Sequence, residues 1–107
     1  MIAPIPGFIG KQGMIKEKLI YSNHAVQQMF KRDISTNAVE MVMENGEIIK
    51  SYPEDTPYPS YLLLGFYEQR PLHIVYSDNR INGCLIIITV YEPSTKIWKK
   101  NFKKRKK

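Results

Sequence analysis

The sequence predicts one α+β domain, in which two N-terminal helices pack on a four-stranded antiparallel β-sheet. Its 107 residues are enough for a single hydrophobic core. Two segments with helical periodicity come first, and four strand-like segments with short connections follow them. Helices followed by a run of closely spaced strands are typical of an α+β fold with an antiparallel sheet.

Composition excludes several classes of protein. With 43% hydrophobic and 24% charged residues, the chain is neither disordered by composition nor a membrane protein. The single cysteine, Cys84, excludes an internal disulfide, and the two histidines, His24 and His73, lack the spacing of zinc ligands. We therefore expect no metal and no cofactor. The first 14 residues lack the pattern of a secretory signal, so a cytoplasmic location is expected.

The charges divide the chain unevenly. The net charge is +6, yet residues 96–107 alone contain eight Lys and Arg and no acidic residue. Such a block is interpreted as a nucleic-acid contact, an anchor for an acidic partner or a solvated tail. The aromatic residues Trp98 and Phe102 within it are expected to dock on the domain or to stack on a base. We divide the chain into a flexible leader (1–14), an α+β domain (15–102) and a basic tail (103–107).

The first helix is expected to follow Ser22, a good N-cap residue. Ala25, Met29 and Phe30 then recur at helical spacing and predict an apolar side. The preceding segment, residues 16–21, is compatible either with a short edge strand or with the approach to this helix.

The second helix is expected to begin near Ser35 and to end at Gly46 in a left-handed conformation. Its buried stripe consists of Ala38, Val39, Val42 and Met43.

Four later segments are predicted to be strands, because each is rich in β-forming residues and is bounded by turn residues. They are residues 47–52, 61–67, 72–77 and 84–91. Strand alternation turns Leu72, Ile74 and Tyr76 toward the core and His73 to the opposite side with Val75. Thr89 and Tyr91 are two residues apart and so share one face of the sheet.

Familiar catalytic motifs are lacking, since no phosphate loop, nucleophile elbow or dinucleotide fingerprint occurs. The remaining candidates are His24 as a proton carrier, Thr89 and Tyr91 as a hydroxyl pair that can grip a phosphate, and Arg32 and His73. Each also has a structural interpretation. His24 can be a buried or capping histidine, and His73 a structural histidine of the sheet. Thr89 and Tyr91 can be ordinary β-formers, and Arg32 can pair with Asp33, Glu40 or Glu44.

Taken together, the ordered pattern of these residues resembles domain-of-unknown-function family 4258. The resemblance runs from about Ile20 to Phe102. It rests on Ser22-x-His24-Ala25, Met29, Arg32-x-Ile34-Ser35, Gly46-Glu47-Ile48-Ile49, Tyr52, Pro57-x-Pro59, Gly65, Pro71-Leu72-His73, Ile88-Thr89-x-Tyr91-x-Pro93 and Trp98. This family looks like part of a grouping of small RNA-cleaving toxins with barnase-like, colicin-type and RelE/ParE-like folds. The resemblance implies two N-terminal helices followed by a four-stranded antiparallel sheet.

The resemblance also implies a catalytic role for His24, Thr89 and Tyr91. One departure is Gln28, which stands where the family usually has an arginine that would supply a fixed positive charge. Arg32, Lys50 or the basic end would then have to compensate, or activity is weak or lost.

The expected function is a small metal-independent endoribonuclease of toxin type. His24, Thr89 and Tyr91 would be catalytic, and RNA would contact Arg32, His73, Lys99 and Lys100. The expected partners are RNA and an acidic antitoxin protein, with no membrane. The alternative from another class is a non-catalytic module of the same fold that binds nucleic acid or protein, and a third is a degenerate protein with neither activity. The oligomeric state is not indicated.

Overall fold

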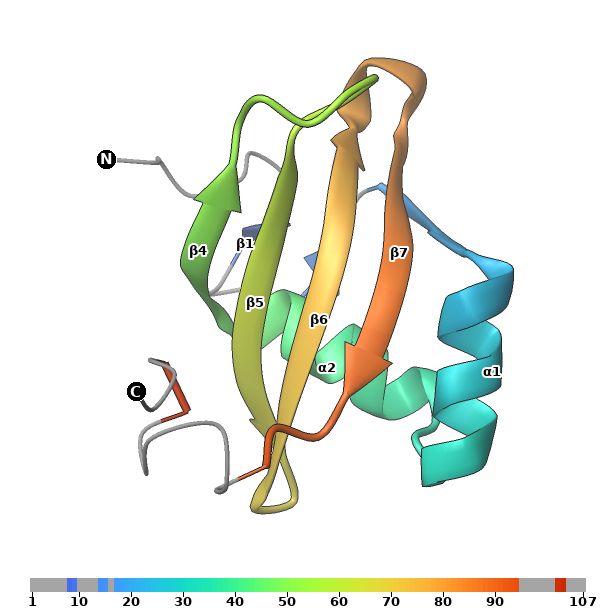
Figure 1. Ribbon diagram of the computed structural model, residues 1–107, viewed down its shortest axis with the longest axis vertical. Coiled ribbons are helices and arrows are strands. Elements are labelled where there is room, and N and C mark those ends of the chain that lie inside the picture. Colours follow the sequence, from blue (N-terminus) through green and yellow to red (C-terminus); the bar gives the residue numbers. More distant parts are fainter. Residues whose placement is uncertain (1–7, 10–13, 16, 95–101, 104–107) are drawn as a thin grey trace.

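A five-stranded mixed β-sheet forms the centre of the molecule in the computed structural model, which describes residues 8–9, 14–15, 17–94 and 102–103 (Figure 1). The order across the sheet is β3-β7-β6-β5-β4. The strands are β3 (Lys18–Tyr21), β4 (Glu47–Tyr52), β5 (Ser60–Tyr67), β6 (Arg70–Asn79) and β7 (Cys84–Tyr91). A separate antiparallel pair, β1 (Phe8–Ile9) and β2 (Met14–Ile15), overlaps the segment 1–14 expected to be a leader and extends one residue beyond it.

The prediction of a four-stranded antiparallel sheet beneath N-terminal helices is wrong, because β3 precedes both helices and adds a parallel fifth strand. It pairs with β7 in the register Leu19 to Leu85 and Tyr21 to Ile87. Parallel neighbours need a long crossover connection, and here the crossover contains both helices and three strands. The short connections between successive strands carry no information about so distant a partner.

Both helices begin at the predicted serines. Helix α1 (Asn23–Arg32) follows Ser22, whose hydroxyl accepts the N–H of Ala25 at 3.0 Å. Helix α2 (Thr36–Asn45) follows Ser35, whose hydroxyl accepts the N–H of Ala38, also at 3.0 Å. These serine oxygens satisfy N–H groups that have no partner inside the helix.

The prediction of a left-handed Gly46 is wrong. Its φ is −77°, an extended conformation that any residue adopts. Glycine is needed here for space. A Cβ atom would lie 2.7 Å from the carbonyl oxygen of Val42 and 2.8 Å from that of Leu64. The end of α2 therefore passes against the backbone of β5 too closely for a side chain.

The core lies between the helices and one face of the sheet, with α2 behind the sheet and α1 beside β7 in Figure 1. The prediction that Leu72, Ile74 and Tyr76 face this core is confirmed, since all three are fully buried there. Their neighbours in the core include Ala25, Met29, Ala38, Val39, Val42, Met43, Leu63, Leu85, Ile87 and Val90. No helix in the described part of the chain is long and apolar enough to cross a membrane.

Candidate functional site

The side of the sheet turned away from the helices carries three of the predicted site residues, His73, Thr89 and Tyr91. We call it the distal face; its central side chains are Leu62, Leu64, His73, Val75, Thr89 and Tyr91. The register aligns one row of side chains across four strands, in the order Glu47, Leu64, His73 and Tyr91. The next row is Lys50, Leu62, Val75 and Thr89.

His73 and Tyr91 form the main polar contact of the first row. The Tyr91 hydroxyl lies 3.0 Å from Nδ1 of His73, and the two rings meet edge to face with centroids 5.2 Å apart. Nε2 of His73 lies 2.7 Å from the backbone carbonyl oxygen of Phe102. Because a carbonyl can only accept, Nε2 carries the proton, and the neutral ring then accepts the Tyr91 O–H at Nδ1.

The environment of His73 favours this neutral form. The residue is 0% exposed, and burial lowers the pKa of its imidazole, partly opposed by the hydrogen bond to the Phe102 carbonyl. His73 was expected to contact substrate. In the structure it is fully buried beside the half-buried Tyr91.

Thr89 lies on the same face as Tyr91, as predicted from their spacing. It pairs with Val75 across β6 and β7 and is half-buried. The structure therefore brings Thr89, Tyr91 and His73 together on two adjacent strands.

The start of α1, the helix that carries His24, is anchored to β7. Ile88 is the extra residue of a β-bulge in β7, and its carbonyl oxygen accepts the hydroxyl of Ser22 at 2.8 Å. His24 follows Ser22 by two residues and Thr89 follows Ile88 by one, so this anchor joins the two segments. The His24 side chain is exposed and forms no hydrogen bond or ion pair with another described residue.

Arg32 is exposed on α1, where its Nε donates to the Gln28 side-chain oxygen at 3.2 Å. The contact joins residues four apart on one helix face. Gln28, which replaces the arginine expected from the family pattern, thus orients the guanidinium of Arg32.

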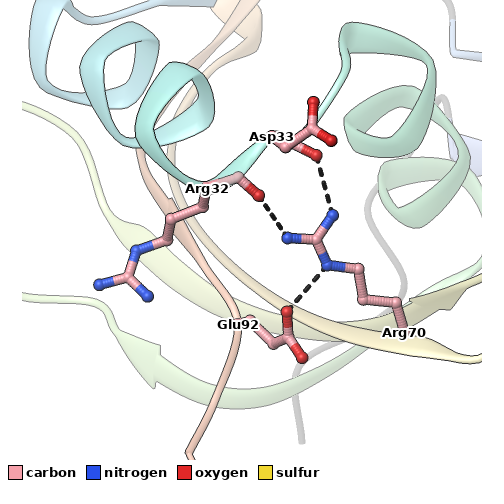
Figure 2. Close-up of polar contacts among 4 residues, drawn as sticks. All are labelled: Arg32, Asp33, Arg70 and Glu92. Atoms are coloured by element: carbon pink, nitrogen blue, oxygen red, sulfur yellow. Dashed lines mark hydrogen bonds and ion pairs between the residues drawn. The ribbon is translucent and has the colours of Figure 1, made fainter.

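Arg70 is a polar centre that sequence reasoning missed (Figure 2). Its Nη1 donates to the carbonyl oxygen of Asp33 at 2.9 Å, and its Nη2 donates to that of Arg32 at 2.5 Å. Its Nε forms an ion pair with Glu92 at 2.8 Å. Arg70 therefore ties the β5–β6 turn and the end of β7 to the carboxyl end of α1, where carbonyls lack helical partners.

The sequence shows that Arg70 follows the Glu68-Gln69 turn. The neighbouring residues, however, contain no signal that predicts its contact with the carboxyl end of α1. The distance along the chain from Arg70 to Asp33 is 37 residues.

The described part of the basic end docks on the distal face. The Phe102 ring meets Phe66 edge to face with centroids 6.4 Å apart, and Lys103 forms an ion pair with Glu47 at 3.2 Å. The prediction that Phe102 docks on the domain is confirmed. Lys99, Lys100 and Trp98 lie outside the described residues.

The chain was compared with protein-family models, curated proteins and solved structures. A family model described as a domain of unknown function, DUF4258, matches residues 21–92. The chain belongs to the DUF4258 family. Neither the curated proteins nor the solved structures compared with it include a match. The family description assigns no activity.

The matched region places the DUF4258 domain within the longer chain. It begins at Tyr21, the last residue of β3, and ends at Glu92, directly after β7. His24, Arg32, His73, Thr89 and Tyr91 all lie inside it. Phe102, whose carbonyl contacts His73, lies outside it. Among the described residues of this DUF4258 protein, no three His, Cys, Asp or Glu side chains gather as a metal site would require.

Proposed function

We propose that this DUF4258 protein is a small metal-independent endoribonuclease of the toxin type. The observation that carries the proposal is the hydrogen bond from the Tyr91 hydroxyl to Nδ1 of His73, beside Thr89 on the distal face. A phenol bonded to a neutral imidazole can accept one proton while passing on its own. Such a pair acts as a base near neutral pH.

The chemistry is an attack of the RNA 2′-oxygen on the adjacent phosphorus. The 2′-hydroxyl proton passes to the Tyr91 oxygen as the Tyr91 proton passes to Nδ1 of His73. The bond from phosphorus to the 5′-oxygen breaks, and protonated His24 supplies the proton that this leaving oxygen needs. The products are a 2′,3′-cyclic phosphate and a 5′-hydroxyl.

Charge and hydrogen bonding on the phosphate complete the proposed site. The Thr89 hydroxyl donates to a phosphate oxygen, and the Arg32 guanidinium, oriented by Gln28, faces the negative charge that develops there. Lys99 and Lys100 add positive charge along the RNA backbone. In the same proposal, an acidic antitoxin protein covers the basic surface and the enzyme acts in the cytoplasm.

The test is cleavage of a short single-stranded RNA by the His24→Ala variant, with a chelator present. His24 is exposed, so the variant should fold normally and lose about 10²- to 10⁴-fold in cleavage rate. Gln27→Ala, which alters the same exposed helix, is the matched control and should cleave like the parent. Cleavage by His24→Ala at the parental rate would remove His24 from the mechanism.

The complete burial of His73 favours a second candidate, a non-catalytic module that binds nucleic acid or protein. Such a module binds RNA with strong salt dependence, because each neutralised phosphate releases about one counterion, and it leaves the RNA intact. Incubation of the parent protein with RNA at two salt concentrations, followed by product analysis, separates the two candidates.

A further inference from the structure

The second hydrogen bond of His73 comes from a segment outside the matched DUF4258 region. We propose that Phe102 is a positioning residue of the Tyr91–His73 pair. Its backbone carbonyl holds the imidazole in the Nε2–H tautomer, so that Nδ1 accepts the hydrogen bond of the Tyr91 hydroxyl. The importance of this tautomer for catalysis rests on the proposed function, whereas the orientation itself does not.

A neutral imidazole has two tautomers, and the partner at one nitrogen decides which of them is present. A carbonyl oxygen at 2.7 Å from Nε2 requires a donor there. The other tautomer would turn two acceptors, the Phe102 carbonyl and Nε2, toward each other and place an N–H at Nδ1. Tyr91 could then no longer pass its proton to that nitrogen.

Two contacts hold residues 102 and 103 in place across the sheet. The Phe102 ring packs on Phe66 of β5, and Lys103 pairs with Glu47 of β4. Glu47 and His73 flank Leu64 in the first row of the distal face, so the contacts of Lys103 and Phe102 lie on either side of Leu64. Leu64 is only 4% exposed although it faces away from the helices.

The backbone of Phe102 is itself unusual. Its φ is +60°, in the left-handed region, which is unfavourable for a residue other than glycine. Such conformations persist where surrounding contacts impose them, and they concentrate at functional sites. Here the left-handed residue is the one whose carbonyl meets His73.

The arrangement gives each group a separate place. Tyr91 is half-buried and so partly accessible to a substrate, His73 is fully buried beside it, and the Phe102 carbonyl meets Nε2, the ring nitrogen that does not face Tyr91. The carbonyl thus orients the imidazole in the way that a third group orients the base of a catalytic triad.

The experiment compares two full-length variants at one position. Phe102→Pro fixes φ near −65°, which is incompatible with the observed backbone and displaces the carbonyl. Phe102→Gly also removes the ring but accepts positive φ, and it is the matched control. Both variants leave all charged residues unchanged.

The first readout is the ¹⁵N NMR spectrum of the two histidine rings. The parent and Phe102→Gly should show His73 as a single Nε2–H tautomer, whereas Phe102→Pro should show a mixture of tautomers. His24, which is exposed, serves as the reference in each sample. A single Nε2–H tautomer in Phe102→Pro would overturn the proposal.

The second readout is cleavage of a short RNA. Phe102→Pro should lose about 10- to 100-fold in kcat with little change in KM, because it misorients an acid–base group whose complete loss costs about 10²- to 10⁴-fold. Parental or faster cleavage by Phe102→Pro would also overturn the proposal and identify the segment as a simple cover. If the parent cleaves no RNA, the proposed function fails, and the NMR spectra alone decide whether Phe102 positions His73.

Discussion

Tyr91 and His73 face each other across β7 and β6, with the phenolic oxygen 3.0 Å from Nδ1 of the imidazole. The pair is buried on one side and half-buried on the other, since His73 is 0% exposed and Tyr91 lies at the margin of the distal face. One hydrogen bond therefore links the buried imidazole of His73 to the side chain of Tyr91, which is partly exposed to solvent. Stability and the proposed chemistry both depend on it.

Replacement of Tyr91 by Phe should reduce both stability and cleavage. The ring remains, but Nδ1 of His73 becomes a buried acceptor without its donor, at a cost of about 1–3 kcal/mol in the free energy of unfolding. The proposed cleavage should fall about 10²- to 10⁴-fold. Tyr52→Phe is the control, because Tyr52 stands on the edge strand β4. Denaturant unfolding and RNA cleavage that are equal in the two variants would contradict the assignment.

Stability should fall as the pH decreases through the ordinary histidine range. The pKa of His73 is lowered in the folded state from its ordinary value of 6.5, so the unfolded chain binds this proton more readily. The contribution of His73 is fully present above pH 6.5 and declines below it. Urea unfolding between pH 5 and 8 should show this slope in the parent and in His24→Ala, and a weaker one in His73→Gln. Equal slopes in all three proteins would exclude His73 as the cause.

Replacement of Arg70 by Ala should loosen the carboxyl end of α1. The change removes donors to the carbonyls of Arg32 and Asp33 and the ion pair with Glu92, at a cost of about 1–2 kcal/mol after allowance for the partial exposure of the site. Hydrogen exchange should accelerate in the last turn of α1. Arg32→Ala removes only an exposed side chain and should change stability by less than about 0.5 kcal/mol. Equal effects of the two changes would show that Arg70 has no special role.

Replacement of Gly46 by Ala should destabilise the fold through a steric clash. The new methyl group would lie under 3 Å from two backbone oxygens, which cannot move independently of α2 and β5. A cost of about 1–3 kcal/mol is expected. Gly83→Asn is the comparison, because nothing lies within 4 Å of its added Cβ and asparagine tolerates the left-handed φ of +78°. Thermal unfolding that ranks Gly83→Asn as the more harmful change would contradict this explanation.

Local signals predicted the elements well. Ser22 and Ser35 mark both helix starts because a serine hydroxyl caps the N–H groups of its own first turn. The strands 47–52 and 84–91 were predicted with the observed bounds, since alternation and turn residues act over a few positions. The same alternation placed His73 with Val75 on the side away from the core and put Thr89 and Tyr91 on a common face, and the register of β6 and β7 then showed that the two faces are the same.

Distant contacts were beyond local signals. The sequence left residues 16–21 undecided because only Leu85 and its neighbours on β7 give them a partner. Gly46 was assigned a left-handed conformation from its position after a helix, whereas the close approach of β5 is what requires glycine there.

The amino-acid sequence alone determined the family, the serine caps of both helices, the approximate segments of β4 to β7 and the core-facing residues of β6, since these follow from patterns a few residues long. Only the tertiary structure decided that β3 joins β7, that Arg70 caps α1, and that the Phe102 carbonyl meets His73. These three contacts join residues 29 to 66 positions apart. These contacts are stabilised by the packing of the whole chain, and so a pattern a few residues long cannot predict them.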